Sequence, residues 1–275
     1  MRIMKVGCST YSYHRAFNDG RMNIDSFLDR MYDLGVEGVE ILDRHIPSDK
    51  ETLRRVKRKA LKLGIEIAAV TISPSSEILS VYPLKLIKAD PVKKIKKWIE
   101  IASFLGAPAM RVDVIRPEGE ATLEDAIQLN IDVIKKVLPV AIEKGIAIGM
   151  ENHSIFRSAD LVLKVVRGVD SEWYGTVPDV GNFVLENKEK AYENIEKVAP
   201  CAIFCHAKTL KLGLGWDGLS SYWEEKIIDY RKVMEIFKRH GFNGYMSQEY
   251  EGREDEETAV PKGHEFLTRL IRQMP

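Results

Sequence analysis

The sequence predicts an α/β protein whose eight parallel strands alternate with helices and close into a (β/α)₈ barrel, with a doubly wound open sheet as the alternative. One observation is a recurring pattern in which an amphipathic helix ends at a glycine and a β-branched run follows. Another is the total of eight strand–helix units, which is reached when three further strands are added to the five that follow this pattern. The length of 275 residues fits one barrel domain over residues 1–275, with no linker-like or low-complexity break.

The eight strands can be placed in order along the chain. Five of them follow a helix that ends at a glycine, which can adopt the left-handed conformation that terminates a helix. These glycines are Gly35, Gly64, Gly106, Gly145 and Gly241. The predicted strands are Lys5–Ser9, Val36–Ile41, Ile65–Thr71, Ala109–Val114, Ala147–Glu151, Thr176–Asp179, Ala202–His206 and Gly244–Glu249.

Three helix starts carry recognisable capping signals. Ser48 with Glu51 predicts a capping box, and Asp90 before Pro91 predicts a cap followed by a first-turn proline. Thr122 is expected to cap the long helix that runs towards Lys144.

Composition excludes several classes of protein. The 41 acidic side chains balance 41 basic ones, so no overall charge favours nucleic acid or an acidic membrane. No apolar run approaches the roughly 20 residues of a membrane span, and the amino terminus leads directly into a strand, which argues against a signal peptide. Cys8, Cys201 and Cys205 form no disulfide framework and are expected to be packing residues. We therefore expect a cytoplasmic protein and leave open whether it forms a homo-oligomer.

Four consecutive strands towards the carboxyl terminus end in side chains that can bind a metal. These are Glu151, Asp179, His206 and Glu249, each placed where packing alone would favour Val or Ile. Any one of them could be a helix cap or a solvated loop residue. Active sites of (β/α)₈ barrels lie where the carboxyl ends of the strands meet, so four such residues together favour one metal site. Three carboxylates and one imidazole suit Mn²⁺, Mg²⁺ or Co²⁺, whereas Zn²⁺ usually takes more nitrogen or sulfur.

At these strand ends the chain resembles the xylose isomerase-like TIM-barrel superfamily of sugar isomerases and epimerases, which also includes endonuclease IV. The resemblance covers nearly the whole length and is most specific at Met150–His153, Pro178–Asn182, Cys205–Lys208 and Gln248–Gly252. It implies that Glu151, Asp179, His206 and Glu249 bind one divalent ion, with Mn²⁺ preferred. It also implies that Glu151 and Glu249 are the catalytic acid–base pair. One departure is Asn182, since many members have His at that position.

The implied reaction is isomerisation or epimerisation of a small ketose or keto-sugar. Such a reaction removes a proton next to a carbonyl, and a metal bound to the oxygens stabilises the enediolate. Glu151 and Glu249 would remove and return the proton from different sides of the sugar.

Several further residues are candidates for binding the substrate. His153 shares the inward parity of Glu151, and Lys208 could neutralise an oxyanion or a phosphate, although each could instead be a loop or surface residue. Arg111 and Asp113 share a parity and either reach the pocket or pair with each other. Glu40 either lines the pocket or satisfies a barrel layer. The remaining candidates are Asn182, Trp216, Glu251 and His14.

The longest irregular segment, Lys208–Glu225, is rich in Gly, Trp and Ser and is expected to border the metal pocket as a lid. Its aromatic residues could stack on a sugar or could simply anchor the loop.

Two other activities remain open. A keto-sugar or keto-inositol dehydratase would begin with the same proton abstraction and then expel hydroxide. Endonuclease IV-like cleavage of DNA is less favoured, because it needs three zinc ions, many histidines and a basic surface. This chain has six histidines and no net positive charge.

Overall fold

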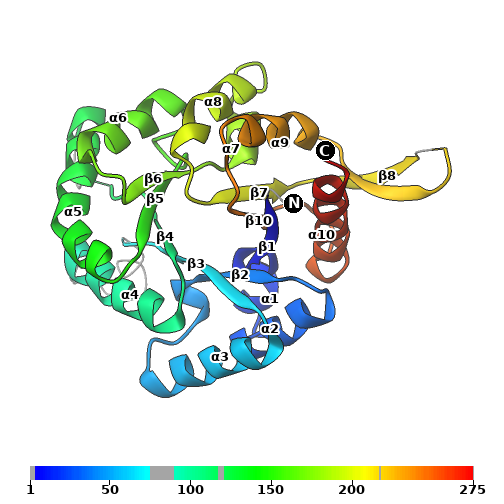
Figure 1. Ribbon diagram of the computed structural model, residues 1–275, viewed down its shortest axis with the longest axis horizontal. Coiled ribbons are helices and arrows are strands. Elements are labelled where there is room, and N and C mark those ends of the chain that lie inside the picture. The colour runs from blue at the N-terminus through cyan, green and yellow to red at the C-terminus, as the bar shows by residue number, and fades with distance from the viewer. Residues whose placement is uncertain (1–3, 75–89, 117–120, 217, 275) are drawn as a thin grey trace.

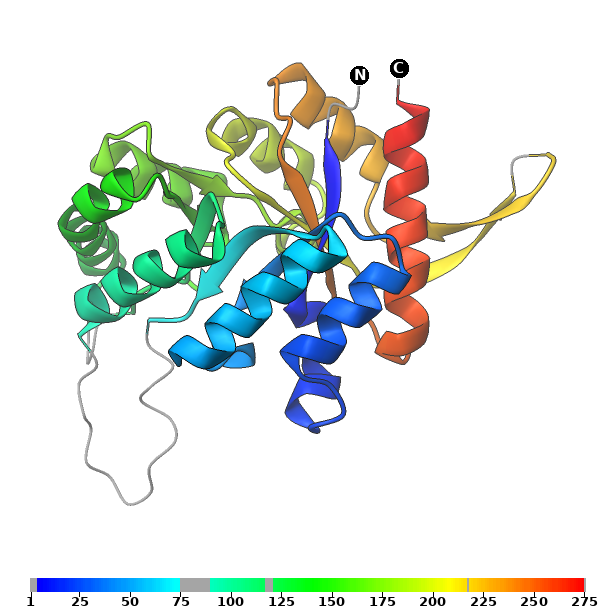
Figure 2. The same cartoon turned by 60° about the horizontal axis from the view of Figure 1, so that its bottom comes forward.

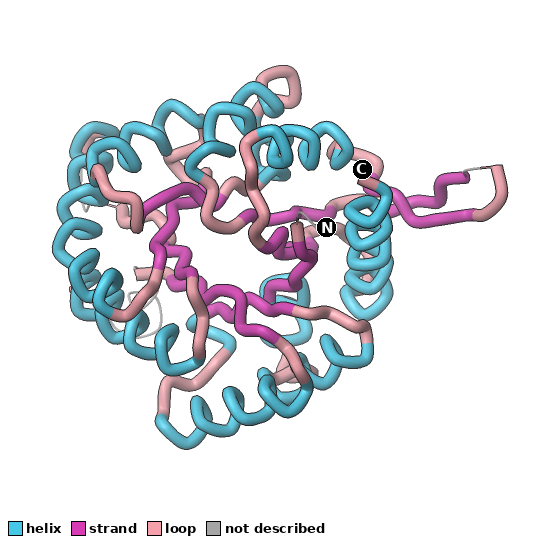
Figure 3. The backbone as a smooth tube through the Cα atoms, viewed as in Figure 1, coloured by secondary structure: helices cyan, strands magenta, loops and turns pink. Residues whose placement is uncertain are grey.

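A computed structural model describes residues 4–74, 90–116, 121–216 and 218–274 of the chain. Eight parallel strands form its central ring, and neighbouring strands pair in the order β6-β5-β4-β3-β2-β1-β10-β7 (Figure 3). These strands are β1 (Lys5–Ser9), β2 (Gly38–Leu42), β3 (Glu66–Ile72), β4 (Ala109–Val112), β5 (Ala147–Glu151), β6 (Tyr174–Val177), β7 (Cys205–Thr209) and β10 (Tyr245–Tyr250).

The ring closes between β6 and β7 through isolated parallel bridges rather than a continuous ladder. Ile203 N–H donates to the carbonyl of Thr176 at 3.0 Å, and His206 N–H donates to the carbonyl of Pro178 at 3.0 Å. Closure confirms the (β/α)₈ barrel and excludes the doubly wound open sheet. The prediction of a seventh strand over Ala202–His206 is wrong in its bounds. Its regular pairing with β10 begins at Cys205 and extends to Thr209, so His206 lies near its start.

Helices surround the ring and cover its outer face (Figures 1 and 2). Their apolar sides pack on strand residues that are buried on both faces, as parallel strands require. The helices are α1 (His14–Asn18), α2 (Ile24–Asp33), α3 (Lys50–Leu63), α4 (Pro91–Leu105), α5 (Leu123–Glu143), α6 (Ala159–Val169), α7 (Val180–Glu186), α8 (Ala191–Val198), α9 (Tyr230–Arg239) and α10 (Glu256–Gln273).

The helix boundaries largely follow the predicted signals. All five predicted glycines have positive φ, for example 70° at Gly64, which is the left-handed conformation expected of a helix-ending glycine. Asp90 caps α4, and Thr122 forms a capping box with Asp125 at α5. The Ser48 box is wrong, because α3 begins at Lys50 and the Asp49 side chain accepts from Thr52 N–H at 2.9 Å.

The segment Lys208–Glu225 does not form the expected lid. Beyond β7 it becomes an antiparallel hairpin of β8 (Leu212–Trp216) and β9 (Ser221–Glu225), which extends outward past α10 (Figure 1). Buried Glu225 fixes the base of this hairpin, because its carboxylate accepts from the N–H groups of Leu210, Lys211 and Ile227. Residue 217 lies outside the described residues.

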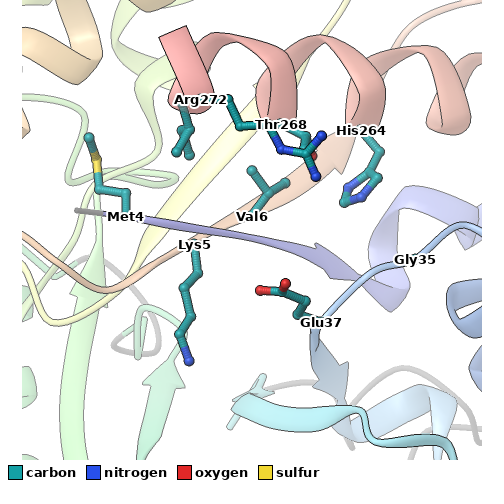
Figure 4. Close-up of a pocket in the computed structure, with 9 residues that line it drawn as sticks. Met4, Lys5, Val6, Gly35, Glu37, His264, Thr268 and Arg272 are labelled. Atoms are coloured by element: carbon teal, nitrogen blue, oxygen red, sulfur yellow. The ribbon is translucent and has the colours of Figure 1, made fainter. Parts of the chain in front are cut away.

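At the amino-terminal end of the barrel, a small cavity of about 50 Å³ lies between β1 and α10. There, side chains of α10 such as His264 and Thr268 lie over β1, with Glu37 opposite them (Figure 4). The start of β1 and the end of α10 share this end of the barrel (Figure 2). In the described part of the chain no helix is long and apolar enough to cross a membrane.

Buried His45 should make the stability of the fold depend on pH. Its ring stacks on Phe17 at 4.2 Å between centroids, and neither ring nitrogen has a hydrogen-bond partner among the described residues. Burial, together with the nearby charges of Arg44 and His14, lowers the pKa of His45 to about 3. In the unfolded chain this histidine has a pKa near ~6.5. Between that pH and pH 3 it is therefore protonated in the unfolded state and neutral in the folded protein.

Neutral His45 costs the fold nothing above pH ~6.5. As the pH falls from there towards 3, protonation of the unfolded chain lowers the free energy of unfolding, and the decrease reaches about 2 kcal/mol at pH ~5. We expect His45→Leu to remove about that much of the loss in unfolding free energy between pH ~7.5 and pH ~5. Urea titration of both proteins at the two pH values measures it. Parallel pH dependence in the two proteins would contradict the prediction.

Candidate metal centre

Four potential ligands converge at the carboxyl end of the barrel. Glu151 ends β5, Asp179 follows β6, His206 lies in β7 and Glu249 lies in β10. All four are buried, and one ligand atom from each lies within 4.8 Å of those of the other three. That separation suits one ion bound through ligand bonds of about 2.0–2.3 Å.

The stagger of the barrel explains why these residues lie at one height. Glu151 pairs with Val177, so Asp179 is two residues further along its strand. Asp179 pairs directly with His206, and His206 pairs with Ser247, two residues before Glu249. Tilted strands in a closed barrel shift in register by two residues at such steps, which brings successive side chains to the same level of the axis.

His206 presents its two ring nitrogens to different groups. Nδ1 faces the other ligands, with Glu151 Oε1 at 2.5 Å and Glu249 Oε1 at 3.5 Å. Nε2 lies 3.0 Å from Glu40 Oε1 on the opposite side of the ring. A carboxylate on the outer nitrogen favours the tautomer that carries its proton there, which leaves Nδ1 free to bind a metal.

Glu40 is itself held firmly. It is fully buried in β2, and it accepts hydrogen bonds from Thr71 Oγ1 and, at 2.9 Å, from Ser247 Oγ. Burial opposes its charge, but His206, Thr71 and Arg111 outweigh it and hold the pKa of Glu40 at about 2. Of the two alternatives considered for Glu40, the structure places it in the barrel layer beneath the site, where it orients His206.

Asp179 is oriented by its backbone and by one oxygen. The side chain of Asn152 bonds both the N–H and the carbonyl of Asp179, at 2.7 and 2.9 Å. Asp179 Oδ1 caps α7 by accepting from Asn182 N–H at 2.9 Å. Oδ2 is buried beside the ammonium group of Lys208 at 3.0 Å but makes no well-aligned hydrogen bond among the described residues, so it is available to a cation.

The electrostatics of the cluster favour additional positive charge. Burial raises the pKa of Glu249 to about 8 against the opposing effects of His206 and Lys208, and burial also raises the pKa of Asp179. Burial alone would lower the pKa of His206, but Glu249, Glu40 and Glu151 raise it well above its usual value. Glu249 and Asp179 therefore hold protons more strongly than isolated carboxyl groups, and a divalent cation could replace those protons.

Glu151 differs from Glu249 because Arg111 contacts it directly. Burial opposes the charge of Glu151, yet Arg111 and His206 hold its pKa well below the usual range. The guanidinium of Arg111 also lies 3.3 Å from Asp113, which has His153 Nδ1 at 3.1 Å and accepts from Ser73 Oγ at 3.1 Å. Asp113, Glu151 and His153 form a second group with metal-type side chains, but Arg111 already provides the positive charge there.

A cavity of about 130 Å³ opens above the cluster. Most of the predicted substrate contacts line it, namely Arg111, His153, Asn182, Lys208 and Glu251. Both alternatives for Arg111 and Asp113 hold, because they pair with each other and also line the cavity.

Two predicted substrate contacts, His14 and Trp216, are not among the residues that line this cavity. A turn over Thr10–Tyr13 carries His14 behind Tyr11, where its Nδ1 lies 3.0 Å from the carbonyl of Tyr11 and 3.3 Å from Glu256. Trp216 ends β8 in the outward hairpin and is 64% exposed.

Five lining residues were missed from the sequence, two of them, Leu42 and Thr71, within strands and three just after strands. Tyr11, Arg44 and Ser73 follow strands β1, β2 and β3 directly and belong to the cavity wall. The same rule that selected residues after the later strands would have found them, had it been applied to the first half of the chain.

The fold and site together define a (β/α)₈ barrel with a candidate metal centre of three carboxylates and one imidazole. A family model described as xylose isomerase-like TIM barrel matches residues 28–270, and the chain belongs to this family. A curated relative, an uncharacterised protein of Methanocaldococcus jannaschii, is 25% identical over 133 residues. That match covers 46% of this chain and 44% of the relative.

Several solved structures share the fold. One is D-psicose 3-epimerase from Clostridium cellulolyticum H10, solved with D-tagatose, at 14% identity and a TM-score of 0.71 over 98% of this chain and 94% of that one. Another is the probable 3-DHS dehydratase AsbF from Bacillus anthracis, at 13% identity and a TM-score of 0.71 over 96% and 99%. A third, from Mycobacterium smegmatis in complex with magnesium, is 17% identical with a TM-score of 0.69 over 90% and 87%.

Proposed function

We propose that the protein is a divalent-metal-dependent isomerase or epimerase of a small ketose or keto-sugar. The observation that carries this proposal is the convergence of Glu151, Asp179, His206 and Glu249 beneath a cavity with polar walls. The solved structures that share the fold of this chain include sugar epimerases, which supports this class of reaction.

The four residues would hold one ion per chain, with Mn²⁺ preferred and Mg²⁺, Co²⁺ and Zn²⁺ also compatible. Magnesium in a related structure supports a hard cation. When bound, the ion would polarise the substrate carbonyl and stabilise the negative charge of the enediolate.

The two glutamates would move the proton. Glu151 and Glu249 lie three strands apart around the ring, so they approach a bound sugar from different sides. One would remove the proton next to the carbonyl, and the other would return a proton to the opposite face in an epimerase. Their environments differ, since Arg111 contacts Glu151 and Lys208 Nζ lies 4.0 Å from Glu249 Oε2.

The cavity wall would orient the sugar hydroxyls. His153 and Glu251 present polar atoms at the mouth, and Asn182 lies beside Lys208, whose Nζ donates to Asn182 Oδ1 at 2.9 Å. Lys208 also lies 2.9 Å from Glu251, so its charge is largely compensated within the wall. We assign these residues, with Arg111, to substrate binding.

A dehydratase on a keto-sugar is the second candidate, because it shares the first proton abstraction and AsbF shares the fold. DNA cleavage of the endonuclease IV type has less support. Each of the two groups of metal-type side chains among the described residues contains one histidine, whereas a cluster of three zinc ions needs many.

Deuterium exchange tests the proposal. The purified protein, loaded in turn with Mn²⁺, Mg²⁺, Co²⁺ or Zn²⁺, is incubated in D₂O with a panel of ketoses and keto-inositols, and a chelator-treated sample serves as the control. We expect at least one ketose to gain deuterium next to its carbonyl and to yield an isomer or epimer. A product lighter by one water identifies the dehydratase instead. If no substrate exchanges with any of the four metals, the proposal is wrong.

A further inference from the structure

A second cavity adjoins the metal cavity on the side of β4 and β5. It has a volume of about 380 Å³ and is lined by Arg116, Ser154 and Arg157, with Asn152, Leu185 and Glu186 completing the wall. His153 and Asn182 line both cavities. The two spaces are therefore neighbours that share a wall, and a molecule bound at the metal could extend into the second one.

Two arginines converge on one residue in this second cavity. Arg116 Nη2 donates to Ser154 Oγ, and Arg157 Nε donates to the carbonyl of Ser154 at 2.6 Å. Ser154 has a φ of 60°, a left-handed conformation that is uncommon for a residue with a side chain. The arginine contacts hold this turn directly after β5 and place both guanidinium groups beside it.

The charges of these two arginines are balanced differently. Arg157 Nη1 lies 2.9 Å from Glu186, which compensates its charge. Arg116 pairs with no carboxylate among the described residues, and its hydrogen-bond partner there is Ser154. A guanidinium has five N–H groups, so the described residues engage only a minority of the donors of Arg116.

The position of Arg116 contrasts with that of Arg111 and Lys208, two of the three cations that line the metal cavity. Arg111 contacts Glu151 and Asp113, and Lys208 contacts Asp179 and Glu251. Carboxylates compensate the charges of Arg111 and Lys208, whereas Arg116 pairs with no carboxylate among the described residues. Arg44, which also lines the metal cavity, lies over the ring of Tyr11 at 5.3 Å from its centroid. An anionic substrate group would therefore be attracted to the second cavity rather than to the carboxylate-rich floor of the first.

We propose that the second cavity is an oxyanion subsite, in which Arg116 binds a phosphate or carboxylate at the end of the substrate remote from the reacting carbon. Arg157 orients the turn at Ser154 through its hydrogen bond to the Ser154 carbonyl, and its guanidinium offers a further N–H donor to the oxyanion. This inference rests on the proposed function, and it narrows the substrate class to ketoses that carry a terminal negative group. Guanidinium groups suit either oxyanion because their paired N–H groups match its oxygens.

The first test measures binding without catalysis. Inorganic phosphate is titrated into the chelator-treated full-length protein by calorimetry, alongside Arg116→Gln and the control Arg239→Gln, which removes an exposed arginine of α9. Loss of a charged hydrogen-bond donor should weaken phosphate binding about 10- to 100-fold in Arg116→Gln but not in the control. Equal phosphate affinity in all three proteins, or no binding to any of them, overturns the subsite.

The second test compares substrates. The ratio of kcat/KM for a ketose phosphate to that for the neutral ketose should fall about 10- to 100-fold in Arg116→Gln. A matched sugar acid separates carboxylate from phosphate as the natural group. If neutral ketoses exchange deuterium but the ratio is unchanged in the variant, the subsite is wrong while the isomerase stands. If no ketose reacts, the proposed function fails and the phosphate titration still decides the subsite.

Discussion

Replacing Glu249 by Gln should lower turnover about 10²- to 10⁴-fold while the protein still binds its metal. Gln keeps the size of the side chain and one oxygen donor, but it cannot accept or return a proton. The same change at Glu151 should have a comparable effect, because a two-face reaction needs both groups. Metal content is measured by elemental analysis, and proton transfer is measured by exchange of substrate hydrogen in D₂O.

A suitable control is Glu265→Gln, which removes an exposed carboxylate of α10 and should leave metal binding and turnover unchanged. The paired-glutamate mechanism would be disproved by a metal-loaded Glu151→Gln or Glu249→Gln protein that exchanges substrate hydrogen at the wild-type rate. In that case Glu251 or His153, which line the same cavity, would be the next candidates for carrying the proton.

Removing the charge of Glu40 should weaken metal binding about 10- to 100-fold, although Glu40 is not one of the four ligands. Its carboxylate lies 3.0 Å from His206 Nε2 and accepts from Thr71 and Ser247. In Glu40→Gln the amide is neutral, and its NH₂ group can face Nε2 and favour the tautomer that protonates Nδ1. A His206 ring in that state cannot offer Nδ1 to the ion.

Calorimetric titration of Mn²⁺ into the wild type and Glu40→Gln measures this effect, with circular dichroism to confirm that the variant is folded. Glu66→Gln is a matched control, since Glu66 begins the neighbouring strand β3 and is exposed. Unchanged affinity in a folded Glu40→Gln protein would show that His206 needs no such partner.

The sequence predicted the ring and the four converging residues because both follow from local patterns. Glycines that end helices mark the strand starts, and a polar residue after an apolar strand is conspicuous. The role of Glu40 could not be predicted in this way. Its partner His206 is 166 residues away, and only the closed ring brings β2 close to β7 across the barrel interior.

Side chains in the loops were harder to place. His14 and Trp216 follow strands β1 and β7, but an intervening turn and a hairpin carry them away from the cavity. The path of a loop depends on contacts such as those of Glu225 with the hairpin base, which no spacing in the sequence reveals. The two misplaced residues are therefore those that a turn or a hairpin separates from their strand.

The seam between β6 and β7 has a consequence for local unfolding. Two neighbouring elements joined by isolated bridges should separate at a lower free energy than strands joined by a full ladder, so amide hydrogens there exchange early. Asp179 and His206 stand on opposite sides of this seam and face the same point. An ion held by both would join the two edges of the sheet, and its binding free energy would add directly to the cost of opening the barrel.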